Sequence, residues 1–443
     1  MQRKLSRRGT AAAAFIVAAA ALTGPLPGSL PVGATDPLPC VDGFSLVAAT
    51  GMIVPQDVYS VSSAKAFVAG GVPLTRGRRA ARIAIYRPKG WRGVSTMRLG
   101  NDSGFVALGG TPFSGLWAVG YIQTRTSLAP LAARRKSDGS WTRVRTPRPA
   151  TGGATLTDVA AHKRQSAWAV GYRLNSPGVR KPYAMRWSRG KWTVRSPGLR
   201  SGERGSLAAV STTRLAGTWV AGSVSRFGAT RPYIARRRSG KWIRMSLPAV
   251  ANGALAAITV SSQNEGWAAG YEVVDATIRP LLLQWDGTAW LRSSAPQFDE
   301  DTLLLDVSTD DAGVISLAGS TWNAPARRMR GFVATRRDAG WNTAIYTAMS
   351  KHSALTAADG DPSAGGWAVG RDLKTGVALQ TCAGAGAASA SRKRAVRRQR
   401  RLATDAALEA SAGTPIHPAE AEPAPRPGSA RVPKLRLMPS ANV

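Results

Sequence analysis

The chain has 443 residues and carries 60 Lys and Arg against 25 Asp and Glu, which gives a formal net charge of +35 at pH 7. Its 47 Gly, 28 Pro and two Cys exclude a collagen, a wholly disordered chain and a disulfide-dense miniprotein. Two Cys and three His provide little for metal or nucleophile chemistry, so we expect neither a metal site nor a cofactor.

The N-terminus has the pattern of an export signal. Four basic residues among the first eight precede an uninterrupted run of small apolar residues over 11–22. This run is too short to cross a bilayer, which needs about 20 apolar residues. Small residues at 32–34 suit cleavage, so residues 1–34 are predicted to be a signal peptide of a secreted, extracellular or envelope-associated protein. The pair Arg7-Arg8 leaves general secretion and twin-arginine export both open. No transmembrane segment is expected after cleavage.

A repeat of about fifty residues fills residues 35–383. Its clearest copies read Trp-Ala-Val-Gly-Tyr at 117–121 and 168–172. Counting degenerate copies, the motif glycine occurs seven times, at intervals of 48–51 residues: Gly70, Gly120, Gly171, Gly222, Gly270, Gly319 and Gly370. Internal repetition at such a period is typical of solenoids and propellers.

Each repeat has four short apolar runs separated by Gly, Pro, Ser and Asp. A second Trp follows a polar turn in six repeats, at Trp91, Trp141, Trp192, Trp242, Trp290 and Trp341. Helical periodicity is absent, so each unit is predicted to be a four-stranded sheet. Seven such units predict an all-β chain that forms a seven-bladed β-propeller, in which the repeated Trp side chains pack between blades.

The last repeat lacks its fourth strand, and the N-terminal segment offers it. Residues 42–47 align with the Trp-bearing strand of the other repeats, with Phe44 in place of Trp. Cys40 and Cys382 lie where this break occurs, and export would place them in an oxidising compartment. We therefore predict a ring closed by the N-terminal strand and by a Cys40–Cys382 disulfide.

These motifs resemble the repeats of secreted actinobacterial β-propeller proteins with Trp-Ala-Val-Gly and Trp-Asp-Gly-x-x-Trp signatures. The segment 284–290, Gln-Trp-Asp-Gly-Thr-Ala-Trp, is the clearest copy of the second signature. The turns are also distantly similar to the Asp-boxes of sialidases and to kelch repeats, although the Gly-Gly doublet of kelch repeats is missing. The resemblance covers roughly residues 40–383 and implies the fold, whereas propellers host many activities.

Basic residues gather between the second and third predicted strands and give a candidate binding face. They are Arg76, Arg78, Arg79, Arg125, Arg173, Arg180, Lys181, Arg226, Arg231, Arg279, Arg327, Arg328 and Arg330. In an up-and-down blade these loops share one face, which would attract anions; alternatively, Arg is simply the solubilising charge of this chain. Trp322, predicted in a loop at an unrepeated position, is a candidate for stacking on a sugar.

Catalytic residues cannot be assigned from the sequence. Glycoside hydrolysis needs two carboxylates at one bond, and acidic residues cluster only around 299–301 and 306–311. Exposure to solvent is the favoured interpretation of these clusters, with cation binding as the alternative. His162 is predicted in a turn within a repeat and His352 in a loop between repeats, at opposite ends of the strands, so a paired site is not expected.

The C-terminal region 384–443 is rich in Ala, Pro, Gly and Ser, contains a basic run over 392–401, and is predicted to be disordered. The favoured function is a secreted, non-enzymatic binding or scaffold propeller that recognises anionic envelope or extracellular polymers, or a protein partner. The alternative is a secreted carbohydrate-active enzyme of glycosidase or sialidase type on the same ring. We expect a monomer.

Overall fold

The computed structural model describes residues 44–47 and 53–381. Short gaps in this range fall at 63, 88–89, 95–96, 98, 100–101, 112–114, 164, 177–178, 311–312, 337–339, 346–351, 360–365 and 373–374. The predicted signal peptide, both cysteines and the predicted tail lie outside the described residues, so the disulfide stays a prediction. No helix among the described residues is long and apolar enough to cross a membrane.

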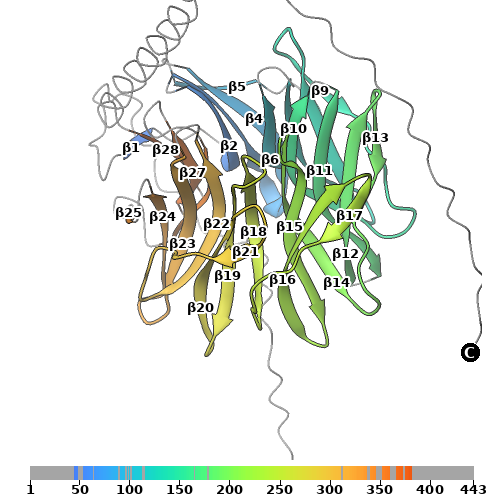
Figure 1. The fold of residues 1–443 in the computed structure, drawn as a ribbon. Coiled ribbons are helices and arrows are strands. Elements are labelled where there is room, and N and C mark those ends of the chain that lie inside the picture. Colours follow the sequence, from blue (N-terminus) through green and yellow to red (C-terminus); the bar gives the residue numbers. More distant parts are fainter. Residues whose placement is uncertain are drawn as a thin grey trace, which may run out of the picture. The chain divides into compact units, whose positions relative to one another are not determined.

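Seven four-stranded antiparallel sheets, blades 1 to 7, form a ring (Figure 1). Blade 1 comprises β2 (Val54–Ser62), β3 (Lys65–Pro73), β4 (Arg79–Arg87) and β5 (Gly90–Gly93), with the 3-10 turn η1 (Thr75–Gly77) between β3 and β4. Blade 2 comprises β6 (Ser103–Thr111), β7 (Gly115–Gln123), β8 (Leu128–Arg135) and β9 (Trp141–Val144). Blade 3 comprises β10 (Ala154–Lys163), β11 (Ser166–Ser176), β12 (Val179–Ser188) and β13 (Lys191–Val194).

The remaining blades repeat this plan. Blade 4 comprises β14 (Arg204–Thr213), β15 (Gly217–Arg226), β16 (Ala229–Arg238) and β17 (Lys241–Arg244). Blade 5 comprises β18 (Gly253–Val260), β19 (Gly266–Val274), β20 (Thr277–Trp285) and β21 (Trp290–Arg292), and blade 6 comprises β22 (Asp301–Thr309), β23 (Ile315–Asn323), β24 (Arg328–Arg336) and β25 (Trp341–Ile345). Blade 7 comprises β26 (Ser353–Asp359), β27 (Trp367–Asp372), β28 (Thr375–Thr381) and β1 (Phe44–Val47).

The N-terminal strand closes the ring, as predicted. β1 pairs antiparallel with β28, and Phe44 lies opposite Thr381. The first strands of neighbouring blades contact one another all round the ring, from β2 through β26 and back to β2. The first strand of each blade is therefore innermost and the fourth outermost, and the first and last described strands, β1 and β28, lie in one sheet.

A β-bulge in every first strand explains the motif glycine. The register between first and second strands shifts at the same place in all seven blades, for example between Leu156 and Asp158 in β10. The bulge brings a carbonyl of the first strand against the motif glycine, so that a Cβ on Gly171 would overlap the oxygen of Thr155. The same overlap holds at all seven motif glycines. Glycine is required there because the backbones approach so closely.

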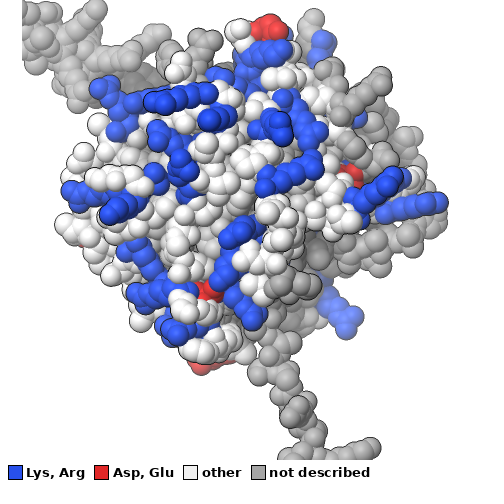
Figure 2. Space-filling view, turned by 90° about the vertical axis from the view of Figure 1, so that its right-hand side faces the viewer, with Lys and Arg blue, Asp and Glu red and all other residues white. Residues whose placement is uncertain are grey.

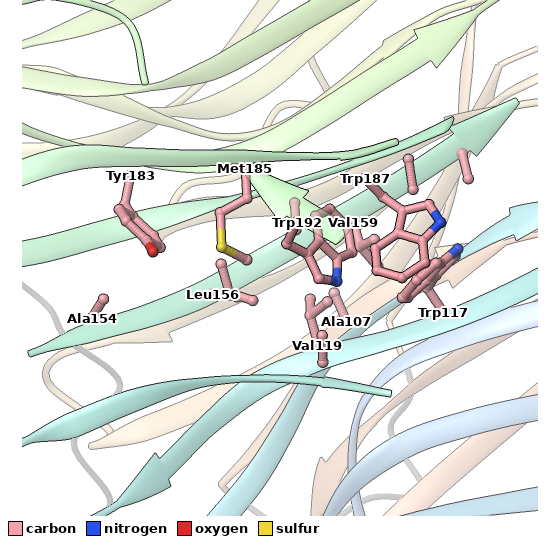
Figure 3. Packing of buried hydrophobic residues seen from close by; sticks show 14 residues of the cluster. Ala107, Trp117, Val119, Ala154, Leu156, Val159, Tyr183, Met185, Trp187 and Trp192 are labelled. Atoms are coloured by element: carbon pink, nitrogen blue, oxygen red, sulfur yellow. The ribbon is translucent and has the colours of Figure 1, made fainter. Parts of the chain in front are cut away.

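The repeated Trp side chains pack between blades, as predicted. Trp117 of blade 2 lies 5.1 Å from Trp187 and 5.0 Å from Trp192 of blade 3, measured between ring centroids. Figure 3 shows these three rings in one buried cluster with aliphatic residues of β10 and β12. Trp168 meets Trp242 of blade 4 in the same way, at 5.3 Å. The second-strand Trp of one blade thus packs on the outer Trp of the next.

The third strand contributes a further side chain to each of these stacks. The position opposite the outer Trp holds Tyr86, Trp187 and Trp285 in blades 1, 3 and 5, and Arg135, Arg237 and Arg336 in blades 2, 4 and 6. The aromatic residues stack directly, whereas the Arg side chains lie over rings; the guanidinium of Arg237 is 5.1 Å from Trp168 and 5.6 Å from Trp242. Part of the arginine content is therefore structural, since a guanidinium fills a place that an aromatic ring fills in alternate blades.

Candidate functional site

Three aspartates lie at the centre of the ring, at the residue that follows the bulge in the first strand. Asp57, Asp158 and Asp306 each use both carboxylate oxygens as acceptors. Asp158 accepts the N–H of Val159 through Oδ1 and the N–H of Val210, in the next blade, through Oδ2, both at 2.6 Å. Asp57 and Asp306 repeat this arrangement in blades 1 and 6, at 2.6–2.9 Å. Each carboxylate thus links two neighbouring blades.

The spacing of these aspartates follows from the two oxygens of a carboxylate. One Asp serves its own blade and the next, so the blade that follows has Ala at the same position: Ala107, Ala209 and Ala357. Three aspartates therefore cover six blades. Seven is odd, and blade 5 is the one left over, with Ala257 at this position and an Ala in the preceding blade.

The pKa values of these three carboxyl groups are raised, and burial is the main cause. Burial raises the pKa of Asp158 to about 6 and that of Asp306 to about 7, and it raises the pKa of Asp57 well above its ordinary value. The negative charges of Asp306 and Asp158 add to the effect at Asp57, whereas the backbone N–H groups oppose it. Among the described residues, no three His, Cys, Asp or Glu side chains come together in a way that could hold a metal ion.

The sequence analysis did not single out Asp57 or Asp158. A raised pKa in a central position is a signal of function in many enzymes. Here each carboxylate oxygen already accepts a backbone N–H, which is the geometry of a link between blades rather than of a general acid and a general base. The sequence does contain a signal for them: the same position of consecutive repeats holds Asp and then Ala, as in Asp158 and Ala209.

The predicted basic residues lie where the sequence placed them, at the hairpin between second and third strands. Arg173 and Lys181 face each other across β11 and β12, Arg279 lies opposite Glu272, and Arg330 lies opposite Thr321. The others occupy the same end of their blades: Arg76, Arg78, Arg79, Arg125, Arg180, Arg226, Arg231, Arg327 and Arg328. We call this end of the ring, formed by the hairpins between second and third strands, the hairpin face.

Several of these basic groups are engaged in contacts of their own. Arg330 forms an ion pair with Glu300 at 2.9 Å, and Lys181 donates to the carbonyl of Glu203 at 2.5 Å. Arg180 lies 4.5 Å from the ring centroid of Tyr172. The acidic residues Glu203, Glu272 and Glu300 thus lie at the hairpin face too, so its positive charge is partly compensated.

A shallow polar pocket of about 400 Å³ lies on the hairpin face between blades 2 and 3. Arg125 and Arg148 line it, together with 126–129 and Gly152. Both arginines are exposed. The pocket brings Arg125 of blade 2 together with Arg148 of the connector between blades 2 and 3.

Two predictions about this end need correction. Trp322 lies in β23, close to its end and paired with Asp301, and not in a loop; it is 39% exposed and available for stacking. Glu300 and Asp301 are not simply solvated, because Glu300 is paired with Arg330 and accepts from Asn323, and Asp301 accepts the N–H of Ile278.

The histidines lie apart, as predicted, but His162 belongs to strand β10 and not to a turn. Its Nδ1 lies 3.1 Å from the hydroxyl of Thr212 in blade 4. Burial lowers its pKa, and the charges of Lys163 and Arg186 lower it further. His352 forms an isolated bridge with Met329.

A second basic surface, which the sequence analysis missed, covers the outside of blades 2 to 4. The hairpins between their third and fourth strands, 133–145, 185–195 and 235–245, carry fourteen Lys and Arg and one acidic residue, Asp138. Figure 2 faces this side of the ring, and basic side chains spread across it with few acidic ones. We call it the outer basic wall. Counting charge hairpin by hairpin would have revealed it.

Three arginines of the outer basic wall meet where blade 3 adjoins blade 4. The carbonyl of Arg195 accepts from the Trp242 indole N–H at 2.6 Å, which places the end of β13 against β17. The guanidinium of Arg237 packs against both Trp168 and Trp242, at 5.1 and 5.6 Å from their ring centroids. Burial lowers the pKa of Arg237, and the nearby charges of Arg186 and Arg195 lower it further. The described residues give none of the three an ion pair with a carboxylate.

Solved structures of similar fold include carbohydrate-active enzymes. An ulvan lyase of polysaccharide lyase family PL25, bound to -[GlcA(1-4)Rha3S]-, shares 10% identity at a TM-score of 0.50 and covers 75% of this chain and 95% of that chain. The GH74 xyloglucanase from Xanthomonas campestris shares 16% identity at a TM-score of 0.50, over 74% of this chain and 53% of that one. No family model and no curated protein matches the chain. At such identities the similarity shows the propeller fold alone.

Proposed function

We propose that the protein is a secreted, non-enzymatic propeller that binds an anionic polysaccharide at its outer surface. The observation that carries the proposal is the outer basic wall, with fourteen basic residues against one acidic residue on three consecutive hairpins. The same hairpin of blade 5, over 283–293, has one basic and one acidic residue, so the basic charge is not spread evenly around the ring. Guanidinium groups suit carboxylates and sulfate esters because they donate paired hydrogen bonds.

The central carboxylates support binding rather than hydrolysis. A glycosidase needs one carboxylic acid and one carboxylate that both reach the scissile bond. The oxygens of Asp57, Asp158 and Asp306 instead accept backbone N–H groups of two blades each. These hydrogen bonds give each carboxylate a structural role in joining two blades.

The proposed location is outside the cell or in its envelope, and the polymer would be encountered there. It rests on the signal-peptide pattern of residues 1–34. The basic residues of 384–443 would strengthen binding to the same polymer through their positive charge. The ulvan lyase of similar fold is bound to a chain that contains GlcA, which makes an acidic polysaccharide a reasonable first ligand to test.

The test is the affinity of the mature chain for dextran sulfate and polygalacturonate, with neutral dextran as the control. We expect binding to the two acidic polymers that weakens steeply as salt rises, because each contact releases counterions. A chain truncated after residue 383 should retain most of the affinity. Absence of binding by the truncated ring at low salt would contradict the proposal.

The alternative is a carbohydrate-active enzyme on the same ring. The specific observation in its favour is the group of raised pKa values at the centre, of about 6 and 7 for Asp158 and Asp306. A panel of fluorogenic glycosides and an absorbance assay for lyase products would detect such an activity. Turnover that disappears in the Asp306→Asn variant would favour the enzyme over the binding protein.

A further inference from the structure

The geometry points to a specific anion subsite on the outer basic wall: Arg186, Arg195 and Arg237 together bind one sulfate or carboxylate group of the polysaccharide. This inference rests on the proposed function and names the place where the polymer is held. Two of the arginines come from blade 3 and the third from blade 4, so the subsite lies at the junction of two blades.

Arg237 is held in place by its aromatic neighbours. Its guanidinium lies 5.1 Å from the ring centroid of Trp168 and 5.6 Å from that of Trp242, with one ring from each blade. Trp168 is buried, and the indole of Trp242 donates to the carbonyl of Arg195. Contact with two rings holds the guanidinium in place, and its N–H groups can still donate to an anion.

Arg186 and Arg195 approach this group from blade 3. Arg186 lies directly opposite Trp168 in the register of β11 and β12, so both side chains are on the same face of the sheet. Arg195 follows β13; its backbone N–H donates to the carbonyl of Ala184, and its guanidinium donates to the carbonyl of Val194 at 2.9 Å. Both side chains are exposed. Burial is the main cause of the lowered pKa of Arg237, and the positive charges of Arg186 and Arg195 lower it further.

Three like charges in one place are unfavourable unless an anion joins them. Two other arginines of the ring have a carboxylate partner: Arg244 pairs with Glu203 at 2.8 Å, and Arg292 with Glu272 at 2.7 Å. At the junction of blades 3 and 4 the described residues supply no such carboxylate to the three arginines. An anionic group of a ligand would balance these charges.

The neighbouring blades extend the subsite into a track. The position of Arg186, opposite the second-strand Trp, holds Arg134 in blade 2 and Arg236 in blade 4. Their guanidinium groups lie 5.3 Å from the ring of Trp117 and 4.8 Å from the ring of Trp219. Similar guanidinium groups at intervals of one blade suit a polymer with repeated negative charges better than a single small anion.

The experiment compares two double variants of the full mature chain that lose the same charge. Arg186→Ser with Arg195→Ser removes the exposed part of the subsite. Arg87→Ser with Arg92→Ser removes two exposed arginines from the matching hairpin of blade 1. Affinities for size-fractionated dextran sulfate and polygalacturonate are measured over a range of salt concentrations, and circular dichroism with thermal unfolding confirms that both variants fold.

We expect the subsite variant to lose at least about tenfold in affinity and the blade 1 variant to lose less than about twofold. The slope of log K against log salt should fall by about 2 for the subsite variant, one for each lost contact. Affinity should also rise with the length of the dextran sulfate chain, until it spans the three blades.

The outcomes separate this inference from the proposed function. Equal losses in the two variants would overturn the subsite while leaving polysaccharide binding in place. No binding by the unmodified chain would overturn both. Binding of duplex DNA as tight as that of the polysaccharides would overturn the assignment of the subsite to a sugar polymer, since phosphate then satisfies the arginines equally well.

Discussion

Replacing Asp158 with alanine tests whether the half-buried central carboxylates link neighbouring blades. The variant removes an acceptor from the N–H of Val159 and from that of Val210. Hydrogen bonds to charged groups contribute about 1.5–3 kcal/mol each, but water can replace part of this and the variant also removes a half-buried charge. We expect a net loss of about 1–3 kcal/mol in the free energy of unfolding at pH 8.

The pH dependence gives the sharper test. Because the pKa of Asp158 is about 6 in the folded ring and near 3.8 when unfolded, the folded state binds more protons between these values. Its contribution to stability therefore falls as the pH rises through about 6, by about 1 kcal/mol from pH 5 to pH 8. Asp306, with a pKa of about 7, contributes a fall of about 3 kcal/mol by the same reasoning.

The expected result is that Asp158→Ala costs about 1 kcal/mol more at pH 5 than at pH 8, measured by urea unfolding. His162 has a lowered pKa and the opposite slope, but it is present in both proteins and cancels in the difference. Asp138→Ala is the control, because hydrogen bonds from Ser140 lower the pKa of this exposed group, so that it stays ionised from pH 5 to pH 8. A cost for Asp158→Ala that is equal at both pH values, or greater at pH 8, would refute the reasoning.

Further predictions concern packing and closure. Trp168→Ala should lose about 3–5 kcal/mol of unfolding free energy, and Trp322→Ala about 0.5 kcal/mol or less, in the same urea assay. Gly171→Ala should lose about 1–3 kcal/mol or more, because its Cβ would overlap a carbonyl of the first strand, and equal stability would contradict the bulge. Alkylation without reductant, followed by intact-mass analysis, should find no free thiol in the exported protein; two alkylated cysteines would contradict the Cys40–Cys382 bridge.

The fold was predictable because its determinants repeat along the chain. The glycine that meets the bulge must recur in every blade, since a Cβ at Gly171 or any counterpart would overlap a carbonyl. The Trp positions recur because each blade must cover the next. Ring closure was predictable for the same reason: Phe44 stands where the outer Trp belongs, and it lies opposite Thr381.

The site was less predictable because its residues depend on which blades adjoin. Arg186, Arg195 and Arg237 are separated by up to a full repeat, and they meet only because blade 3 packs on blade 4. Nothing in the local sequence distinguishes Asp158 from other polar residues in apolar runs. Its role depends on its second oxygen, which accepts the N–H of Val210 in the next blade. Such contacts link a residue to a partner one repeat away, which local sequence patterns do not reveal.

Net charge alone also obscures the site, because the arginines of this ring have at least three different roles. Arg237 and its counterparts in blades 2 and 6 take the place of an aromatic ring between two blades. Arg244, Arg292 and Arg330 pair with glutamates. Arginines without a carboxylate partner among the described residues are the ones available to a ligand, and Arg237 joins them although it is half-buried, because no ion pair engages it. The placement of these arginines on consecutive hairpins, and not the total charge of the chain, therefore marks the candidate site.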